Sequence, residues 1–188
     1  MPRARKVKDK WREKKWLIVE APPSFGSVPI AYIPITDPSK ALGRTVETTL
    51  YDLLKQDPQH YVIKLKFQII AVEGDRAKTL LNTVEYSREF LRSLVRRRSS
   101  MVSYVQDYIT KDGFKVRFQV VAFTQWKINS SRKHAIRMAA HKVLTEKTGS
   151  LSFDQLAQEV VLQKLGIKKF RFIKRLAPAE EAVAPMPS

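Results

Sequence analysis

The stretch Ser87–Met101 concentrates side chains that can bind phosphate. Five arginines lie in it, and Arg96, Arg97 and Arg98 follow one another directly before two serines. A guanidinium group can donate two parallel hydrogen bonds to phosphate oxygens, so a cluster of this kind predicts a surface that binds a polyanion. The alternative is a solvated charged face, which is the commoner explanation for a basic run considered by itself. The choice between the two depends on the rest of the chain.

The spacing of residues in this stretch predicts one amphipathic helix. At about 100° per residue, one sector is apolar and a row of arginines recurs at four-residue spacing. The apolar sector contains Phe90, Leu91, Leu94 and Val95, and the row contains Arg88, Arg92 and Arg96. Arg97 would project near the edge of the apolar sector and Arg98 inside it, so we expect the helix to end there. The C-terminal end of a helix also favours positive charge.

The positive charge of the chain is confined to a few segments. The net charge is +17 and the pI is near 10.2, yet most of the 188 residues are close to neutral in sum. The excess comes from residues 1–15, 87–98, 127–147 and 164–175, which together carry +21. Patches of this kind are typical of a folded protein with a polyanionic partner, and they argue against a uniformly basic disordered chain.

Two tryptophans stand at the beginning of the chain. Residues 1–15 form a basic arm with no apolar periodicity, which we expect to be extended until it binds a partner. Trp11 lies inside this arm, where an aromatic ring can stack on an unpaired base or pack on the domain edge. Trp16 opens the first apolar run, and we expect it in the core.

These side chains must be positioned by a fold of the α+β class. The pattern predicts a single domain on a mostly antiparallel sheet, open or barrel-like, with about three helices and an extended basic N-terminal arm. Strands are predicted over residues 45–50, 61–72, 79–86, 102–109 and 114–123, and a basic-faced edge strand over residues 168–176. The prolines of residues 22–38 leave room only for short edge strands.

A hairpin is predicted at Lys111-Asp112-Gly113. The Asp-Gly pair suits a type I′ turn, in which both central residues have positive φ. Basic side chains on the second arm of the hairpin, among them Lys115 and Arg117, are expected to face outward. The inward side chains are predicted to be Val116, Phe118, Val120 and Ala122.

Two helices are expected after the hairpin. Ser130 or Ser131 can cap the first, which should run to about Thr148 with Gly149 as its stop. Its apolar stripe is predicted to contain Ile136, Ala139, Ala140, Val143 and Leu144, and a second face to turn His134, Arg137 and His141 toward solvent or RNA. Amides of its first turn, near Arg132 and Lys133, would add donors for a phosphate.

A capping box predicts the second of these helices. Ser152 and Gln155 have the required spacing of three residues. The apolar side of the helix is predicted to contain Phe153, Leu156, Val160 and Val161.

The sequence offers little support for an enzyme or a membrane protein. The six glycines never cluster, so phosphate-binding loops of the nucleotide enzymes are missing, and no serine has a nucleophile context. The chain has no cysteine, and its three histidines lack the spacing of a zinc site. Cysteine absence fits an intracellular protein, and neither a signal peptide nor a membrane span is predicted.

Five segments of the chain carry a resemblance to a known family. They are Lys10–Trp16, Asp37–Arg44, Glu47–Leu53, Leu91–Ser100 and Thr110–Arg117. The arginine run followed by the Lys-Asp-Gly hairpin is the most specific part. In this order the segments resemble the eS1, or S3Ae, family of small-subunit ribosomal proteins that archaea and eukaryotes share, over about Lys8 to Leu176. The length is that of the archaeal type, and the C-terminal tail departs from the family pattern.

The resemblance implies a non-enzymatic structural component of the small ribosomal subunit in the cytoplasm. It would lie on the platform, near the 3′ end of the rRNA and the mRNA exit. Its partners would be rRNA, neighbouring platform proteins and mRNA near the exit, with no cofactor, metal, small-molecule substrate or membrane. From the residues alone, the alternatives are a free-standing RNA- or DNA-binding regulator and a nucleic-acid hydrolase that uses acids such as Asp107 or Asp112.

The predicted organisation has three parts: a basic extension over residues 1–15, an RNA-binding domain over residues 16–176 and a disordered tail over residues 177–188. The basic patches and the matched segments together give the predicted RNA contacts. These are Lys10, Trp11, Arg12, Lys14, Lys15, Arg44, Arg88, Arg92, Arg96, Arg97, Arg98, Lys111, Lys115, Arg117, Arg132, Lys133, Arg137, Lys168, Lys169 and Arg171.

Overall fold

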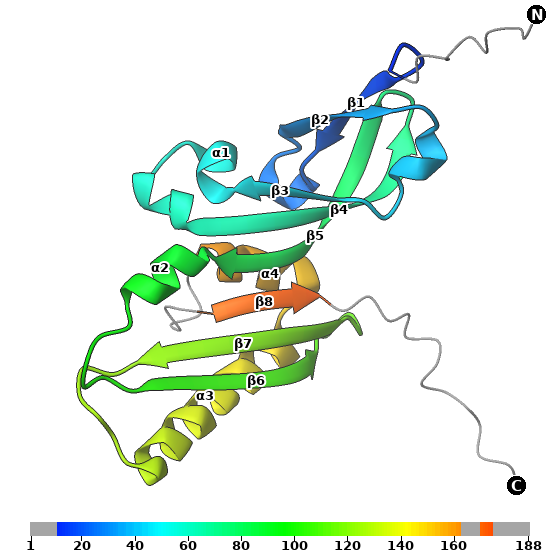
Figure 1. Cartoon of the computed structure of the whole chain (residues 1–188). Helices are drawn as coiled ribbons and strands as arrows, with labels where there is room; N and C mark the ends of the chain where they lie inside the picture. Colours follow the sequence, from blue (N-terminus) through cyan, green and yellow to red (C-terminus); the bar gives the residue numbers. More distant parts are fainter. Residues whose placement is uncertain (1–10, 163–169, 175–188) are drawn as a thin grey trace, which may run out of the picture. The chain divides into compact units, whose positions relative to one another are not determined.

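The computed structural model describes residues 11–162 and, for the backbone alone, residues 170–174 (Figure 1). The chain divides into two compact units. The first lies within Met1–Val46 and Phe67–Leu80, and the second within Glu47–Lys66 and Leu81–Ser188. Strands β4 (Ile63–Glu73) and β5 (Arg76–Tyr86) each contribute residues to both units.

Alternating apolar side chains build the first unit. β1 (Lys15–Glu20) pairs antiparallel with β2 (Pro29–Ile35) and parallel with the beginning of β5. Its hydrophobic core consists of Leu17, Val19, Ile35, Ala41, Ile69 and Ala77. β2 lies at an edge of the sheet, which agrees with the prediction from the prolines of residues 22–38.

Trp16 does not belong to this core. Its side chain is 63% exposed, because Leu17 and Val19 point inward and successive residues of a strand face opposite sides. The predicted core position of Trp16 is therefore wrong. On the outer face, Trp16 lies opposite Pro34 in the register of β1 and β2.

β3 (Thr45–Thr49) ends one residue earlier than the predicted strand does, and a short helix follows. The hydroxyl of Thr49 accepts a hydrogen bond from Asp52 N, and the Asp52 carboxylate accepts one from Thr49 N, both at 3.3 Å. This capping box begins α1 (Leu50–Leu54), so Leu50 is a buried helical residue and not the end of a strand.

β4 confirms the clearest of the predicted strands. Its inward residues Ile63, Leu65, Phe67 and Ile69 are all buried. The strand begins at Ile63, two residues later than predicted, because Pro58–Val62 forms a 3-10 helix, η3. β4 pairs with β3 on one side and with β5 on the other, and Gly74-Asp75 forms the turn between β4 and β5.

The sheet of the second unit has the strand order β5-β8-β7-β6 (Figure 1). β6 (Met101–Ile109) and β7 (Lys115–Phe123) form the predicted hairpin. β8 (Phe170–Lys174) lies between β7 and β5 and pairs antiparallel with both. The prediction of an edge strand here is wrong, because hydrogen-bonded neighbours occupy both sides of β8. Alternation predicts that a segment is a strand, but it does not predict its partners.

The turn of the hairpin differs from the predicted type I′ turn. Gly113 has a φ of 80°, but Asp112 is not among the residues with positive φ. Thr110 N donates to Phe114 O at 3.0 Å, and Gly113 N donates to Thr110 O at 2.9 Å, which gives a three-residue loop with one left-handed glycine. A three-residue loop needs a positive φ only at its last residue, which Gly113 supplies. The Asp112 carboxylate in this loop accepts a hydrogen bond from Phe153 N at 2.7 Å.

Helix α3 (Ser130–Ser150) packs on β6, as Figure 1 shows. Its N-cap is Asn129 and not Ser130 or Ser131, and it passes through Gly149 instead of stopping there. The buried stripe is also rotated from the predicted one. Leu144 and Thr148 are buried and Ala140 is half-buried, whereas Ala139 and Val143 are exposed.

Helix α4 (Phe153–Val161) confirms its prediction in full. Ser152 N donates to Gln155 Oε1 at 3.3 Å within the predicted capping box. The predicted apolar residues Phe153, Leu156, Val160 and Val161 are all buried. The remaining elements are α2 (Arg88–Ser93) and the 3-10 helices η1 (Pro23–Phe25) and η2 (Pro38–Ala41).

The fold class agrees with the α+β prediction. Four α-helices occur in the described residues, where about three were predicted, and the one parallel pairing given above joins β1 to β5. Over residues 11–162 and 170–174 the sheet does not close into a barrel, because β2 pairs only with β1 and β6 only with β7. In the same ranges, no helix is both long enough and apolar enough to cross a membrane.

Candidate nucleic-acid interface

α2 is shorter than the helix predicted from the arginine spacing. Ser93 Oγ donates to the Phe90 carbonyl at 2.7 Å, and Val95 N donates to the Arg92 carbonyl only three residues back. A hydroxyl bonded to the preceding turn and a three-residue backbone bond are both typical of the last turn of a helix. Arg88 and Arg92 are therefore helical and exposed, and the remaining arginines of the run are not on the helix.

Because α2 ends at Ser93, two further predictions are wrong. Arg96 does not continue a helical row with Arg88 and Arg92, because it lies beyond the helix. Val95 is 57% exposed instead of lying in the apolar sector. Phe90, Leu91 and Leu94 are half-buried, so three of the four predicted apolar residues take part in packing.

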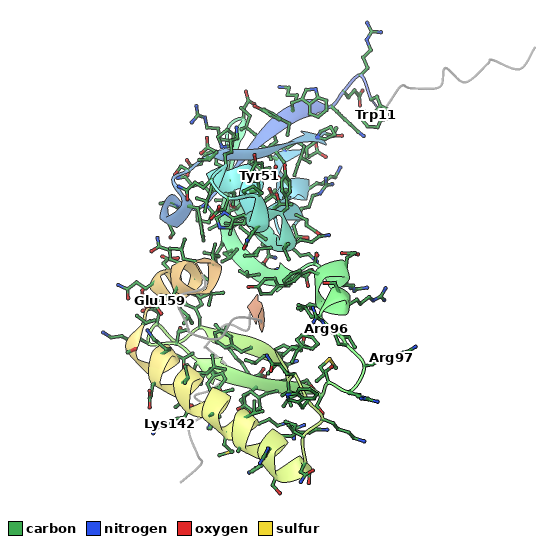
Figure 2. All side chains as sticks on the ribbon, turned by 90° about the vertical axis from the view of Figure 1, so that its left-hand side faces the viewer. Trp11, Tyr51, Arg96, Arg97, Lys142 and Glu159 are labelled. Carbon is green, nitrogen blue, oxygen red and sulfur yellow. The ribbon has the colours of Figure 1, made fainter. Side chains whose placement is uncertain are left out.

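Arg96–Ser99 forms a tight turn, which we call the arginine turn. Ser99 Oγ donates to the Arg96 carbonyl at 2.6 Å and accepts from Arg96 N at 3.3 Å. Arg98 has a φ of 63°, in the left-handed region. Arg96, Arg97 and Arg98 are all exposed, and in Figure 2 the Arg97 side chain points away from the strands.

Ser100 joins this turn to the loop that follows β7. Ser100 N donates to Thr124 Oγ1 at 3.1 Å, and Thr124 N donates to the Ser100 carbonyl at 3.0 Å. The Ser100 hydroxyl also accepts a hydrogen bond from Ile128 N at 3.2 Å, and the residue is only 6% exposed. Ser99 and Ser100 thus hold the backbone of the arginine turn.

The guanidinium groups near this turn are not paired with acids. Within the part of the chain that the structure describes, Arg88, Arg92 and the arginines of the arginine turn form no ion pair. Between Phe90 and Gln106, and again between Gly113 and Thr145, the sequence has no acidic residue. Their charge is therefore available to an external anion, and Glu89, the one acidic residue of α2, offsets only part of the positive field that attracts a polyanion.

The lysines on the sheet are in a different situation. Lys66 Nζ lies 3.0 Å from a carboxylate oxygen of Glu85 and 3.6 Å from one of Glu47, and Lys64 lies 3.2 Å from Glu47. The hydrogen bond from Lys64, followed by the charge of Lys66, lowers the pKa of Glu47 against the opposing effect of burial. These cross-strand pairs neutralise the basic face of β4.

The beginning of α3 adds cations near the same end of the β6–β7 hairpin. Arg132 is exposed and Lys133 is half-buried. Arg137 Nε donates to the Ser103 carbonyl of β6 at 3.1 Å, so part of this guanidinium serves the packing of α3 on the sheet. Arg132 is therefore accessible to an RNA phosphate.

The basic residues of the hairpin lie elsewhere. Lys111 and Lys115 are exposed at the turn end, and nine-residue strands separate that end from the arginine turn by roughly 25–30 Å. Arg117 forms a two-bond ion pair with Asp107 opposite it, with distances of 2.5 and 2.8 Å. Those bonds raise the pKa of Arg117. Its charge is compensated within the sheet.

The predicted contacts of the first unit form a separate group. Trp11 is 67% exposed, and the ammonium of Lys14 lies 3.5 Å from the centroid of its ring. This cation–π contact holds the Trp11 ring and the Lys14 ammonium next to each other. Arg12, Lys15 and Arg44 are exposed as well. Figure 2 labels Trp11 near the start of β1.

Four predicted contacts receive no side-chain description. Lys10, Lys168 and Lys169 lie outside the described residues. Arg171 lies in β8, where only the backbone is described.

One predicted solvent-facing histidine packs inward. His141 Nδ1 lies 2.9 Å from both the Tyr104 and the Tyr108 hydroxyls, and the two hydroxyls are 3.0 Å apart. Burial, with the Tyr104 hydrogen bond next in size, raises the pKa of Tyr108. His134 is exposed as predicted. In the described ranges, no three side chains of the His, Cys, Asp and Glu types come together as a possible metal site.

Sequence reasoning missed an aromatic residue at the arginine turn. Trp126 is 73% exposed and lies in the loop between β7 and α3. It borders a hollow of about 360 Å³ whose lining also includes Arg96 and Ser99. The available signal was a tryptophan directly followed by a lysine in a segment without acids.

Comparison with known proteins gives consistent matches over most of the chain. The sequence profile of the ribosomal S3Ae family matches residues 2–183. A protein of Desulfurococcus amylolyticus named small ribosomal subunit protein eS1 is 41% identical over 172 residues, which are 92% of this chain and 80% of that protein. Proteins of the same name from Saccharolobus islandicus and Saccharolobus solfataricus are 43% identical over 176 residues, 94% of this chain and 84% of theirs.

Proposed function

This chain belongs to the ribosomal S3Ae family, and from that premise we propose that it binds rRNA in the small ribosomal subunit through the arginine turn and the cations around it. The chain is a structural component of the small ribosomal subunit of the archaeal type, in the cytoplasm, and not an enzyme. Its partners are rRNA and other ribosomal proteins. The observation that carries the RNA-binding proposal is the set of exposed arginines without acidic partners.

The proposed mechanism is recognition of phosphate and shape. Guanidinium groups of Arg88, Arg92 and the arginine turn displace counterions from the RNA backbone, and this release supplies affinity without reading sequence. The hydrogen bonds of Ser99 and Ser100 keep the turn in one conformation before binding, so little backbone entropy is lost on association. Arg132 and Lys133 extend the same surface along α3.

We place the protein on the platform of the small subunit, near the 3′ end of the rRNA and the mRNA exit. This finer location rests on the family resemblance. Neighbouring platform proteins, and mRNA near the exit, are the proposed further partners. The basic arm with Trp11 and Lys14 offers a second contact with RNA, in which the indole stacks on an unpaired base.

Sedimentation of small subunits tests the RNA-binding proposal. The variant Arg96→Gln, Arg97→Gln, Arg98→Gln removes three cations from the arginine turn. The control variant Lys40→Gln, Arg76→Gln, Lys78→Gln removes three exposed cations that pair with Asp37, Glu20 and Glu73. Wild type and control should travel with small subunits at moderate salt, and the arginine variant should shift to the soluble fraction.

Two outcomes would contradict this proposal. Equal retention of the arginine variant and the control would mean that the arginine turn is a solvated charged face. Recovery of wild type mainly in the soluble fraction would favour a free-standing RNA- or DNA-binding regulator. Circular dichroism of each variant establishes that the changes leave the fold intact.

A further inference from the structure

We infer that the hollow beside Trp126 is a binding site for one unpaired nucleobase of a single-stranded RNA segment. The inference rests on the proposed function, since it specifies how RNA is held at the arginine turn. It adds a base-binding site to a surface that otherwise contacts only phosphates.

The first argument is the exposure of a large aromatic side chain on a fixed loop. Trp126 is 73% exposed, although burying an indole is strongly favourable. Its backbone is held in place, because Thr124 Oγ1 donates to the Trp126 carbonyl at 2.7 Å and Ile128 N donates to Ser100 Oγ at 3.2 Å. The ring is therefore presented to solvent on an ordered segment, which is the arrangement of a stacking platform.

The second argument is the shape and lining of the hollow. Its volume of about 360 Å³ falls in the range of about 300–1,000 Å³ typical of small-ligand sites. The lining comes from two loops that Ser100 and Thr124 join by direct hydrogen bonds. It consists of Leu94, Arg96, Ser99, Phe123, Thr124, Gln125 and Trp126.

This lining suits a flat heteroaromatic ligand with polar edges. Trp126 offers a π-face, and Leu94 and Phe123 offer apolar contact. Gln125 carries an amide that can both donate and accept, which matches the mixed edge of a nucleobase. A purely aliphatic protein side chain would leave these polar groups without partners.

The third argument is the charge around the hollow. Arg96 is part of the lining, Arg97 and Arg98 follow it, and Lys127 follows Trp126. None of the lining residues is acidic. A ligand that is aromatic at its centre and anionic at both flanks is a nucleotide within a strand, so the surroundings favour a base over a hydrophobic peptide.

Fluorescence of Trp126 tests the inference. The full chain with Trp11→Phe and Trp16→Phe keeps Trp126 as its single tryptophan. It is titrated with a short single-stranded RNA and with a matched strand in which all bases are missing. Stacking should quench Trp126 with the intact strand, and the abasic strand should leave the fluorescence nearly unchanged although it carries the same phosphates.

Binding constants of variants supply the second measurement. In the otherwise wild-type chain, Trp126→Ala should weaken binding of the intact strand by about 5- to 150-fold and should hardly change binding of the abasic strand. Trp126→Phe should restore most of the affinity, since phenylalanine also stacks. The control is Ile109→Ala, which removes another exposed apolar side chain at the far end of β6, 68% exposed in wild type.

Each outcome decides the inference. If the intact strand binds but neither quenches Trp126 nor responds to Trp126→Ala more than the abasic strand does, the base site is wrong and phosphate binding at the arginine turn stands. If no strand binds, the base site is also wrong, and sedimentation with small subunits decides the proposed function independently. Ultraviolet crosslinking of Trp126 in small subunits free of mRNA identifies rRNA as the expected source of the base, whereas a crosslink that needs added mRNA identifies mRNA.

Discussion

At the scale of single residues, Tyr108 lies in a buried site that favours its neutral, protonated form. Its hydroxyl lies between Tyr104 and His141, at 3.0 and 2.9 Å, and the residue is 8% exposed. Burial raises its pKa in the fold above the value of about 10 for an unfolded chain. Between those two pKa values the folded protein keeps a proton that the unfolded chain releases.

A decrease in stability at alkaline pH follows from this. The contribution of Tyr108 is complete below about pH 10 and is lost as the pH rises through the pKa of the folded state. We expect Tyr108→Phe to reduce the fall in unfolding free energy above pH 10, as measured by urea denaturation at several pH values. Tyr32→Phe, at an exposed position of the first unit, is the control. An identical pH dependence in wild type and Tyr108→Phe would contradict the prediction.

Asp112 connects the hairpin turn to the beginning of α4. Its carboxylate accepts a hydrogen bond from Phe153 N, one of the amides that a helix leaves without an internal partner. We expect Asp112→Ala to lower the unfolding free energy by about 1 kcal/mol. Asp112→Asn keeps an acceptor oxygen and should lose less.

Chemical denaturation measures these changes, and RNA binding provides a second measurement. Because Asp112 serves folding, Asp112→Ala should leave RNA affinity unchanged under conditions in which the protein is folded. Wild-type stability in Asp112→Ala would show that the contact contributes nothing.

At the scale of elements, the arginine turn places a cation on a backbone that favours glycine. Arg98 has a φ of 63°, and left-handed φ values cost a side-chain-bearing residue about 1 kcal/mol relative to glycine. Arg98→Gly should therefore raise the unfolding free energy by up to about 1 kcal/mol while it weakens RNA binding. Arg97→Gly, where φ is not positive, should weaken binding without any gain in stability.

Denaturation and RNA titration of the two variants measure the two effects separately. A higher unfolding free energy together with a lower RNA affinity in Arg98→Gly would mean that the Arg98 side chain contributes to RNA binding and destabilises the turn. A variant that gains stability with unchanged affinity would remove Arg98 from the interface.

The elements that were correctly predicted share a local cause. Alternation in β4 and the capping box of α4 each involve residues a few positions apart, so the sequence contains the whole signal. β8 was placed at an edge because pairing with β5 and β7 depends on segments far away in the chain. The arginine spacing also predicted too long an α2, because hydrogen bonds of Ser93 and Ser99 outweigh a periodic pattern.

The candidate interface was predictable in part for the same reason. Charge runs identify Arg96–Arg98 directly, since no structure is needed to count cations. Whether a cation has an acidic partner depends on cross-strand neighbours, as Arg117 with Asp107 and Lys66 with Glu85 illustrate. Trp126 escaped notice because its importance comes from a hollow that two distant loops form together.

At the scale of the whole molecule, the net charge of +17 is divided between compensated and uncompensated cations. Only the uncompensated ones can release counterions when they meet RNA. The salt dependence of binding counts these contacts, because the slope of log K against log salt changes by about 0.7–0.9 for each phosphate neutralised. The slope therefore distinguishes the contribution of the arginine turn from that of cations that only add to the net charge.

We expect Arg96→Gln, Arg97→Gln, Arg98→Gln to reduce that slope by about 2–3 in a titration with small-subunit rRNA, because three phosphate contacts are lost. The control Lys40→Gln, Arg76→Gln, Lys78→Gln lowers the net charge by the same amount at ion-paired positions and should change the slope by much less. Filter binding at several salt concentrations measures both. Equal slopes for the two variants would mean that total charge, and not the position of the arginines, determines RNA affinity.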